Sequence, residues 1–170
     1  MARSGRWWTV PPSAPGGAVG YTVGAEVAKR RILAVDDEPA VTTLLTRVLT
    51  KDGYDVRTVA SAEDALAAMD AGFIPDLLIS DKNLPRMLGL ELVRVVRLRL
   101  PQLPVIVITA APEALHGNPD RIDVYLAKPF RTLEVLRDAV SEAFERQRAA
   151  RERVELQRKL NEVVAQLRRG

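Results

Sequence analysis

The sequence contains no cysteine, a single histidine and no apolar run long enough to cross a membrane. The absence of cysteine excludes disulfides, thiolate metal sites and cysteine nucleophiles, and it fits a reducing cytoplasm. The only histidine, His116, lies in a polar stretch where we expect it to be solvated, and no chemistry is assigned to it. With 170 residues, of which 47% are apolar and 28% charged, the chain is predicted to form one soluble globular domain with extensions.

The excess of positive charge belongs to the two ends of the chain. Residues 1–30 contain four bases and one acid, and residues 144–170 contain eight bases and four acids. Because the whole chain carries +3, the residues between these ends carry −4. Neither basic end contains a recognition motif, so we do not expect direct binding to nucleic acid.

Residues 1–28 are rich in proline, glycine and small residues and show no apolar periodicity. This composition predicts a disordered N-terminal tail. Prolines interrupt any apolar core of a signal peptide, so secretion is not expected. The tail also contains Trp7 and Trp8, but an unstructured segment is favoured over a binding arm anchored by these tryptophans.

From residue 31 onwards, strand and helix patterns alternate, which predicts a parallel sheet with helices on both faces. Short apolar runs indicate strands, and proline, capping residues and glycine mark the ends of the helices. The predicted strands are residues 32–35, 54–59, 77–81, 104–109 and 123–127. The predicted helices begin at Pro39, at Ser61, at Gly89 and near Thr132, with one more, short or split, within residues 111–121.

The predicted helix at residues 90–100 is apolar around much of its circumference. We therefore expect it to be well buried. Its three arginines, Arg94, Arg97 and Arg99, are expected to form its solvated face.

The last helix is predicted to continue far beyond the globular part. Helix formers run from Leu133 to Leu167 without glycine or proline, a length of about 52 Å as a helix. Its first turns are expected to pack on the sheet, Leu133 included, while its second half carries apolar residues at the spacing of a coiled-coil seam. An isolated solvated helix remains an alternative, but a coiled coil that joins two copies is favoured. The seam residues are Leu156, Leu160, Val163 and Leu167.

Three carboxylates are predicted at strand ends: Asp36 and Asp37 follow the first strand, and Asp81 ends the third. In a doubly wound, flavodoxin-like sheet of order 2-1-3-4-5 these two strands are neighbours, so the three side chains share one cleft. Such close like charges favour a divalent cation, and ligands that are all oxygens point to Mg²⁺. The backbone carbonyl of Asn83 is a further candidate ligand. Capping of the following helices is the plainer alternative for these acids.

Two more polar side chains are predicted at the same edge of the sheet. Thr109 ends the fourth strand and Lys128 follows the fifth. A metal, a lysine and a hydroxyl around a carboxylate suit phosphoryl transfer, in which Asp81 attacks in line and the cations neutralise the phosphoryl oxygens. The product is an acyl phosphate.

Taken together, these motifs resemble the receiver domain of two-component response regulators over about residues 31–144. The resemblance divides the chain into a tail (1–28), a receiver domain (29–144) and a helical or coiled-coil extension (145–170). Each motif is weak alone, but their order and their positions at strand ends are specific. The motifs are Asp36-Asp37, the strand that ends at Asp81, Leu84-Pro85 with Gly89 to Leu92, Thr109-Ala110, and Tyr125 to Phe130.

The resemblance implies a role for each site residue. Asp81 is the phosphoacceptor, Asp37 binds Mg²⁺ directly, Asp36 binds it mainly through water, and Asn83 offers its carbonyl. Lys128 binds the phosphate, and in this family the Lys-Pro bond that follows is usually cis.

The resemblance also implies a conformational switch. Thr109 is the switch hydroxyl, and Tyr125 takes the place of the aromatic residue that turns inward when the threonine moves. A half-buried core aromatic is an equally weighted interpretation of Tyr125. The interval from Thr109 to Lys128 is a few positions shorter than is usual in the family, and the loss falls within residues 111–121.

The implied function is a cytoplasmic module that accepts a phosphoryl group from a sensor histidine kinase and signals through its last helix, as a homodimer, to an unspecified partner. We do not expect enzymatic turnover or contact with a membrane. One alternative is a phosphatase that uses an aspartyl phosphate, but such enzymes need an acid two residues after the nucleophile, where this chain has Asn83. Another alternative is an adaptor that dimerises by its coiled coil while the pocket stays idle.

Overall fold

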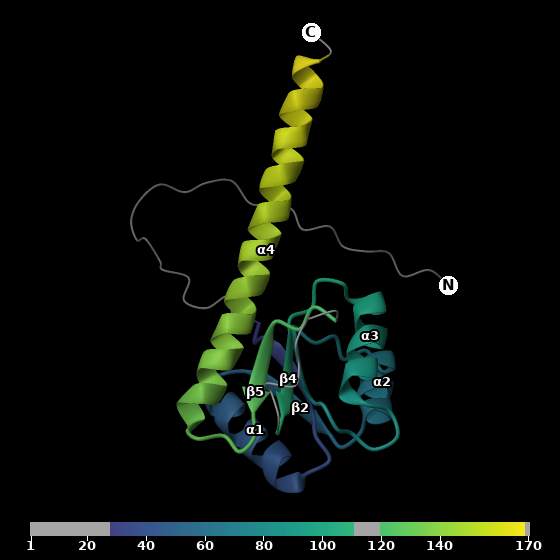
Figure 1. Cartoon of the computed structure of the whole chain (residues 1–170), viewed down its shortest axis with the longest axis vertical. Helices are drawn as coiled ribbons and strands as arrows, with labels where there is room; N and C mark the ends of the chain where they lie inside the picture. The colour runs from purple at the N-terminus through teal and green to yellow at the C-terminus, as the bar shows by residue number, and fades with distance from the viewer. Residues whose placement is uncertain (1–27, 111–119, 169–170) are drawn as a thin grey trace, which may run out of the picture.

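The structure, a computed structural model, describes residues 28–110 and 120–168. Its centre is a five-stranded parallel sheet in the order β2-β1-β3-β4-β5, which confirms the predicted order. Figure 1 shows the sheet between two layers of helices, with one helix extending far from the globular part. The strands are β1 (Arg31–Val35), β2 (Asp55–Val59), β3 (Leu77–Asp81), β4 (Val105–Thr109) and β5 (Val124–Ala127).

The helices lie close to the predicted positions. Residues 1–27 of the predicted tail, and residues 111–119 of the predicted helix at 111–121, lie outside the described residues. None of the described helices combines the length and hydropathy that a membrane span requires. The helices are α1 (Pro39–Lys51), α2 (Ala62–Asp70), α3 (Gly89–Arg99) and α4 (Leu133–Leu167).

The sheet is buried on both faces because successive strand residues point in opposite directions. In β1, Ile32 and Ala34 join the apolar cluster beneath α1 and α4. Leu33 and Val35 join the other cluster, beneath α2 and α3. This arrangement explains why the central strands are short continuous apolar runs, and it confirms helices on both faces of the sheet.

The sequence signals at the helix ends take the expected geometry. Pro39 opens α1 at a position where the missing N–H is not needed. Gly53, just after α1, has a φ of +93°, which a glycine adopts without strain. Ser61 caps α2: its Oγ accepts a hydrogen bond from the Asp64 N–H at 3.1 Å. The ends of β1 and β3 lie next to each other because these two strands pair directly in the sheet.

α3, expected to be well buried because it is apolar around much of its circumference, is buried on one face only. Leu92, Val93 and Val96 are buried against the sheet, whereas Leu98 is 85% exposed. The apolar content of this helix therefore exceeds what one face can bury.

The three arginines of α3 do not share one environment. Arg94 and Arg99 are exposed as expected. Arg97 is not: its side chain is 19% exposed, and its Nη2 lies 3.2 Å from Oδ2 of Asp123. The same nitrogen donates to the carbonyl of Arg121. Arg97 thus ties the end of α3 to the segment before β5 instead of lying in solvent.

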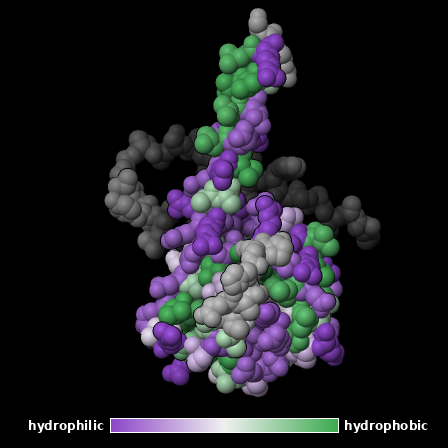
Figure 2. Space-filling model, viewed as in Figure 1, coloured by the Kyte–Doolittle hydropathy of each residue, from purple (hydrophilic) through white to green (hydrophobic). Residues whose placement is uncertain are grey.

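α4 begins as a core helix and ends as an exposed one. Leu136, Val140, Ala143 and Phe144 are buried, while Leu133, expected to pack on the sheet, is 40% exposed. Just beyond Phe144, the Gln147 side chain still donates to the Gln102 carbonyl at 2.9 Å. Farther along, the helix projects from the globular part, and Figure 2 shows hydrophobic side chains on this projecting half. The exposed apolar residues there are Val154, Leu156, Leu160, Val163, Val164 and Leu167.

Candidate functional site

Three acidic side chains meet at the carboxyl edge of β1 and β3. These strands pair in parallel, with Val35 opposite Ser80, so the residues that follow leave the sheet side by side. Asp36, Asp37 and Asp81 each offer a carboxylate oxygen, and these oxygens all lie within 4.8 Å of one another. The structure therefore brings together the three acids that the sequence placed in one cleft.

The two inner acids are held by the backbone around them. Asp36 is 1% exposed and Asp81 is 7% exposed, whereas Asp37 faces solvent. The Asp36 N–H donates to the Val59 carbonyl at 3.1 Å. Its Oδ1 accepts from the Glu38 N–H at 2.9 Å, which fixes the direction of the carboxylate.

Gly89 allows α3 to begin directly against the end of β3. A Cβ at this position would lie 1.9 Å from the carbonyl oxygen of Asp81. The Gly89 N–H donates to the Lys82 carbonyl at 3.0 Å, which closes the loop between strand and helix. Any side chain here would push the backbone that carries Asp81, so glycine is a requirement of the site.

Lys128 reaches the acids from the end of β5. Its N–H donates to the Thr109 carbonyl at 2.9 Å, which aligns β5 with β4. Its Nζ lies 2.8 Å from Oδ2 of Asp36 and 3.6 Å from Oδ1 of Asp81. The bond between Lys128 and Pro129 is cis, as the resemblance implied. The site thus contains the predicted ammonium beside the predicted nucleophile.

Glu38 is a member of this site that the sequence analysis missed. Its Oε1 lies 2.7 Å from Nζ of Lys128, closer than either aspartate. Glu38 does not end a strand, which was the feature that identified the other acids; it is the residue before α1, and its side chain makes no capping bond. Its position next to Asp36 and Asp37 in the sequence was the signal that could have identified it.

The charges in the cluster do not balance. Burial raises the pKa of Asp81, the charge of Lys128 opposes that shift, and the charge of Asp36 adds to it. Burial alone would lower the pKa of Lys128, but hydrogen bonds to Asp36 and Glu38 raise it overall, so the side chain is a cation at neutral pH. Four carboxylates therefore share one ammonium, which leaves the cluster with a net negative charge. Because all of its potential ligand atoms are oxygens, the cluster fits a hard divalent cation.

The remaining predicted residues lie around this cluster. Thr109 ends β4 and is almost fully buried. Tyr125, in β5, is half-buried against the cluster beneath α2 and α3, and this burial, followed by the charge of Asp120, raises its pKa. Asn83 is exposed in the loop that follows Asp81.

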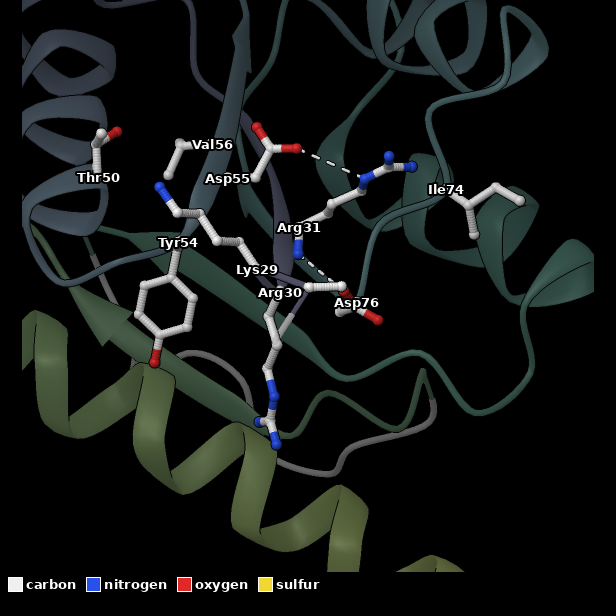
Figure 3. A pocket seen from close by; sticks show the side chains of 10 residues that line it. Lys29, Arg30, Arg31, Thr50, Tyr54, Asp55, Val56, Ile74 and Asp76 are labelled. Atoms are coloured by element: carbon white, nitrogen blue, oxygen red, sulfur yellow. Dashed lines mark hydrogen bonds and ion pairs between the residues drawn. The ribbon is translucent and has the colours of Figure 1, made fainter. Parts of the chain in front are cut away.

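A surface cavity of about 800 Å³ lies elsewhere, at the amino edge of the strands. Two of its acidic lining residues, Asp55 and Asp76, pair with Arg31 (Figure 3). Nε of Arg31 lies 3.5 Å from Oδ2 of Asp55, and its backbone N–H donates to Asp76. In parallel α/β sheets, ligands collect at the carboxyl edge, so we assign the function to the acidic cluster and not to this cavity.

A doubly wound sheet of this order, with an acidic cluster and a lysine at its carboxyl edge, defines a CheY-like α/β domain. The model of the response regulator receiver domain matches residues 32–141. The chain belongs to the receiver domain family of two-component response regulators.

Individual relatives agree with this membership. The transcriptional regulatory protein TcrA of Mycobacterium tuberculosis is 38% identical over 124 residues, which cover 71% of this chain and 47% of TcrA. The chain spans about half the length of the curated relatives it matches. Among solved structures, the chemotaxis response regulator CheY4 of Vibrio cholerae matches with a TM-score of 0.61 and 29% identity, covering 68% of this chain and 98% of CheY4. TrrA of Thermotoga maritima, in complex with Mg²⁺-BeF, matches with a TM-score of 0.59 and 31% identity, covering 67% of this chain and 98% of TrrA.

Proposed function

We propose that Asp81 accepts a phosphoryl group from the phosphohistidine of a sensor histidine kinase. The observation that carries this proposal is the convergence of Asp36, Asp37 and Asp81 within 4.8 Å, with Nζ of Lys128 3.6 Å from Asp81. Membership of the receiver family supports the choice of phosphodonor.

The proposed reaction is a single displacement at phosphorus. An oxygen of the Asp81 carboxylate forms the new P–O bond while the P–N bond to the donor imidazole breaks. The nitrogen keeps the electron pair and takes a proton, and the product is an acyl phosphate. Lys128 neutralises charge on the phosphoryl oxygens because its raised pKa keeps it protonated.

We propose Mg²⁺ as the cofactor, held by Asp37, Asp36, Asp81 and the backbone carbonyl of Asn83. The ion supplies positive charge that offsets the phosphoryl oxygens and the surrounding carboxylates. Two observations support the fit: the ligand oxygens of the three aspartates lie close together, and their charge exceeds what Lys128 can balance.

Phosphorylation is proposed to act on the neighbouring strands through Thr109 and Tyr125. Thr109 ends β4 beside the cluster, so its hydroxyl is placed to approach a phosphoryl oxygen. Tyr125 lies on the adjacent strand, β5, at a half-buried position where an inward rotation is compatible with its packing. The change then reaches α4, which packs on β5 and β4.

We further propose that the projecting half of α4 pairs with α4 of a second copy. At about 100° per residue, the seam formed by Leu156, Leu160, Val163 and Leu167 faces roughly 150° away from the side of α4 that packs on the sheet. The globular part therefore does not block the seam. Ion pairs occupy a different face: Arg158 pairs with Glu155 and with Glu162, at 2.9 Å in both cases.

Other parts of the proposal rest on the sequence and on the family resemblance. We place the module in the cytoplasm and propose no direct contact with nucleic acid. The relative TcrA is named a transcriptional regulatory protein, but the match covers only 47% of it, so this absence of nucleic-acid binding stays a prediction. We also propose that the chain promotes its own phosphorylation and slow dephosphorylation without enzymatic turnover. Steady hydrolysis of a phosphate ester would contradict this statement.

Phosphorylation is tested by incubating the chain with acetyl phosphate and Mg²⁺ and measuring the intact mass. We expect one added phosphate, no addition to an Asp81→Asn variant, and no addition to the parent in the presence of a chelator. Equal labelling of Asp81→Asn would refute the assignment.

Dimerisation is tested by size-exclusion chromatography with light scattering. A Leu160→Glu change, which puts a charge in the seam, should convert dimer to monomer. Asn161→Glu adds the same charge outside the seam and should leave the dimer intact. If both variants keep the parent's mass, α4 is not the element that joins two copies. A dimer that forms while acetyl phosphate adds no phosphate would favour the adaptor alternative.

A further inference from the structure

Lys128 contacts Asp36 and Glu38 in addition to Asp81, the residue beside which its proposed role places it. An ammonium has three N–H donors. One of them donates to Oε1 of Glu38 at 2.7 Å, and the ammonium also forms an ion pair with Oδ2 of Asp36 at 2.8 Å. The proposed phosphoacceptor, Asp81, lies farther away at 3.6 Å. Lys128 is therefore engaged most closely by the residues that receive no phosphate.

The two close partners differ in how firmly they are held. Asp36 is buried, with a side chain that is 0% exposed, and its other oxygen is fixed by a backbone N–H. The Glu38 side chain is 59% exposed and touches the cluster only through Lys128 among the contacts within the described residues. Glu38 thus draws the ammonium toward the solvent side of the cluster.

We infer that Glu38 is a positioning residue that restrains Lys128 and slows transfer of a phosphoryl group to Asp81. The inference rests on the proposed function. A phosphoryl group on Asp81 needs Lys128 at hydrogen-bonding distance, whereas Nζ lies 3.6 Å from Asp81 and 2.7 Å from Glu38. Movement of the ammonium toward Asp81 stretches its contact with Glu38, so removal of the Glu38 charge removes that restraint.

Glu38 can be changed without loss of the local fold. It precedes α1, but its side chain makes no capping hydrogen bond; its backbone carbonyl accepts the first bonds of the helix. A Glu38→Gln substitution keeps the shape and removes the charge. A Glu38→Ala substitution removes the contact altogether and checks that the glutamine amide does not replace it.

The test compares initial rates of labelling with acetyl phosphate and Mg²⁺. Because Glu38 is partly exposed, loss of its ion pair should raise the rate about two- to fivefold. Glu63→Gln is the matched control, since Glu63 also pairs with a basic side chain at the surface, Arg86 at 3.1 Å. That control should label at the parent rate. An unchanged or lower rate for both Glu38 variants would overturn the inference.

Two further measurements separate restraint of Lys128 from other effects of the charge. The gain should be the same with phosphoramidate, a donor with less negative charge than acetyl phosphate. A gain seen only with acetyl phosphate would mean simple repulsion of the donor.

Mg²⁺ affinity, measured by calorimetry, should stay unchanged, because a marked loss would make Glu38 a metal ligand. If Asp81→Asn labels like the parent, the proposed function itself fails. If that variant is inert while the Glu38 variants behave as the parent, only this inference fails.

Discussion

The carboxyl edge of the sheet buries charged side chains, whereas the projecting half of α4 exposes apolar ones. At the edge, the charged side chains of Asp36 and Asp81 are buried, and both contact Lys128. On α4, the side chains of Leu156 and Leu160 are exposed, and no described residue covers them. Both arrangements cost free energy in an isolated chain.

The two regions differ in what can offset this cost in free energy. The acidic edge is assembled within one chain by neighbouring strands, and we propose that a small cation balances its remaining charge. The stripe on α4 has no counterpart on its own globular part, because it faces away from the sheet. A second helix is the kind of partner that matches its spacing. The following four predictions test this comparison, in order of decreasing effect on stability.

The largest loss is expected where α4 belongs to the core. Leu136 is fully buried against the sheet. Leu136→Ala removes buried methyl groups and leaves a cavity, so the free energy of unfolding should fall by about 3 kcal/mol. Urea denaturation followed by circular dichroism measures this change. A loss below about 1 kcal/mol would show that α4 is only loosely attached to the sheet.

The next effect is expected at the turn that carries Asp81. A methyl group at Gly89 would overlap the Asp81 carbonyl, so Gly89→Ala should cost about 2 kcal/mol and slow phosphorylation. Gly72→Ala is the control: no atom lies within 4 Å of its added Cβ, and only its φ of +95° is unfavourable. The control should cost about 1 kcal/mol and leave labelling unchanged. Equal effects on labelling would mean that Gly89 does not position Asp81.

A smaller effect, opposite in sign, is expected from the buried charge of Asp81. Burial raises its pKa in the folded state above the unfolded value of 3.8, so the folded protein binds a proton that the unfolded chain releases. Stability without metal should therefore fall as the pH rises from about 3.8 through the folded-state pKa. Asp81→Asn should therefore be more stable than the parent at pH 7 in chelator.

That gain should disappear at acidic pH, below the unfolded pKa, where the parent's carboxyl group is protonated in both states. Mg²⁺ should also reduce it, because the metal stabilises the ionised form. Urea denaturation at several pH values measures both trends. If Asp81→Asn is less stable than the parent in chelator at pH 7, the carboxylate is better compensated than the geometry indicates.

The smallest effect on stability is expected in the exposed stripe. Leu160 is 54% exposed, so Leu160→Ala should change the free energy of unfolding of the dilute chain by less than about 0.5 kcal/mol. The same change should weaken dimerisation by severalfold, measured by sedimentation equilibrium. A large loss of stability at low concentration would mean that the stripe packs on its own chain.

Most of the fold was predictable because the strands are apolar on both faces. Such runs, separated by helical patterns, specify a parallel sheet, and the acids that follow them then share one edge. The site geometry followed from the same reasoning for Asp36, Asp37 and Asp81. The position of Lys128 beside these acids was predictable because parallel strands end at the same edge of the sheet.

The residues that were misjudged depend on contacts distant in the sequence. Arg97 is enclosed because Asp123 lies 26 positions away in the chain, and helical periodicity contains no information on that partner. Leu98 is exposed because none of the described elements covers its side of α3. Glu38 was missed because its importance arises from Lys128, 90 positions away. Periodicity identifies elements and faces, while such pairs appear only when the chain is folded.

The unbroken course of α4 has a mechanical consequence. From Gln147, whose side chain still donates to the Gln102 carbonyl, to Leu167 the helix extends about 30 Å. Its tip follows any tilt of the packed turns, so a tilt of about 10° at the sheet displaces the tip by about 5 Å. A motion too small to alter the packing of the helices on the sheet therefore becomes a displacement of several ångströms at the C-terminal end of α4.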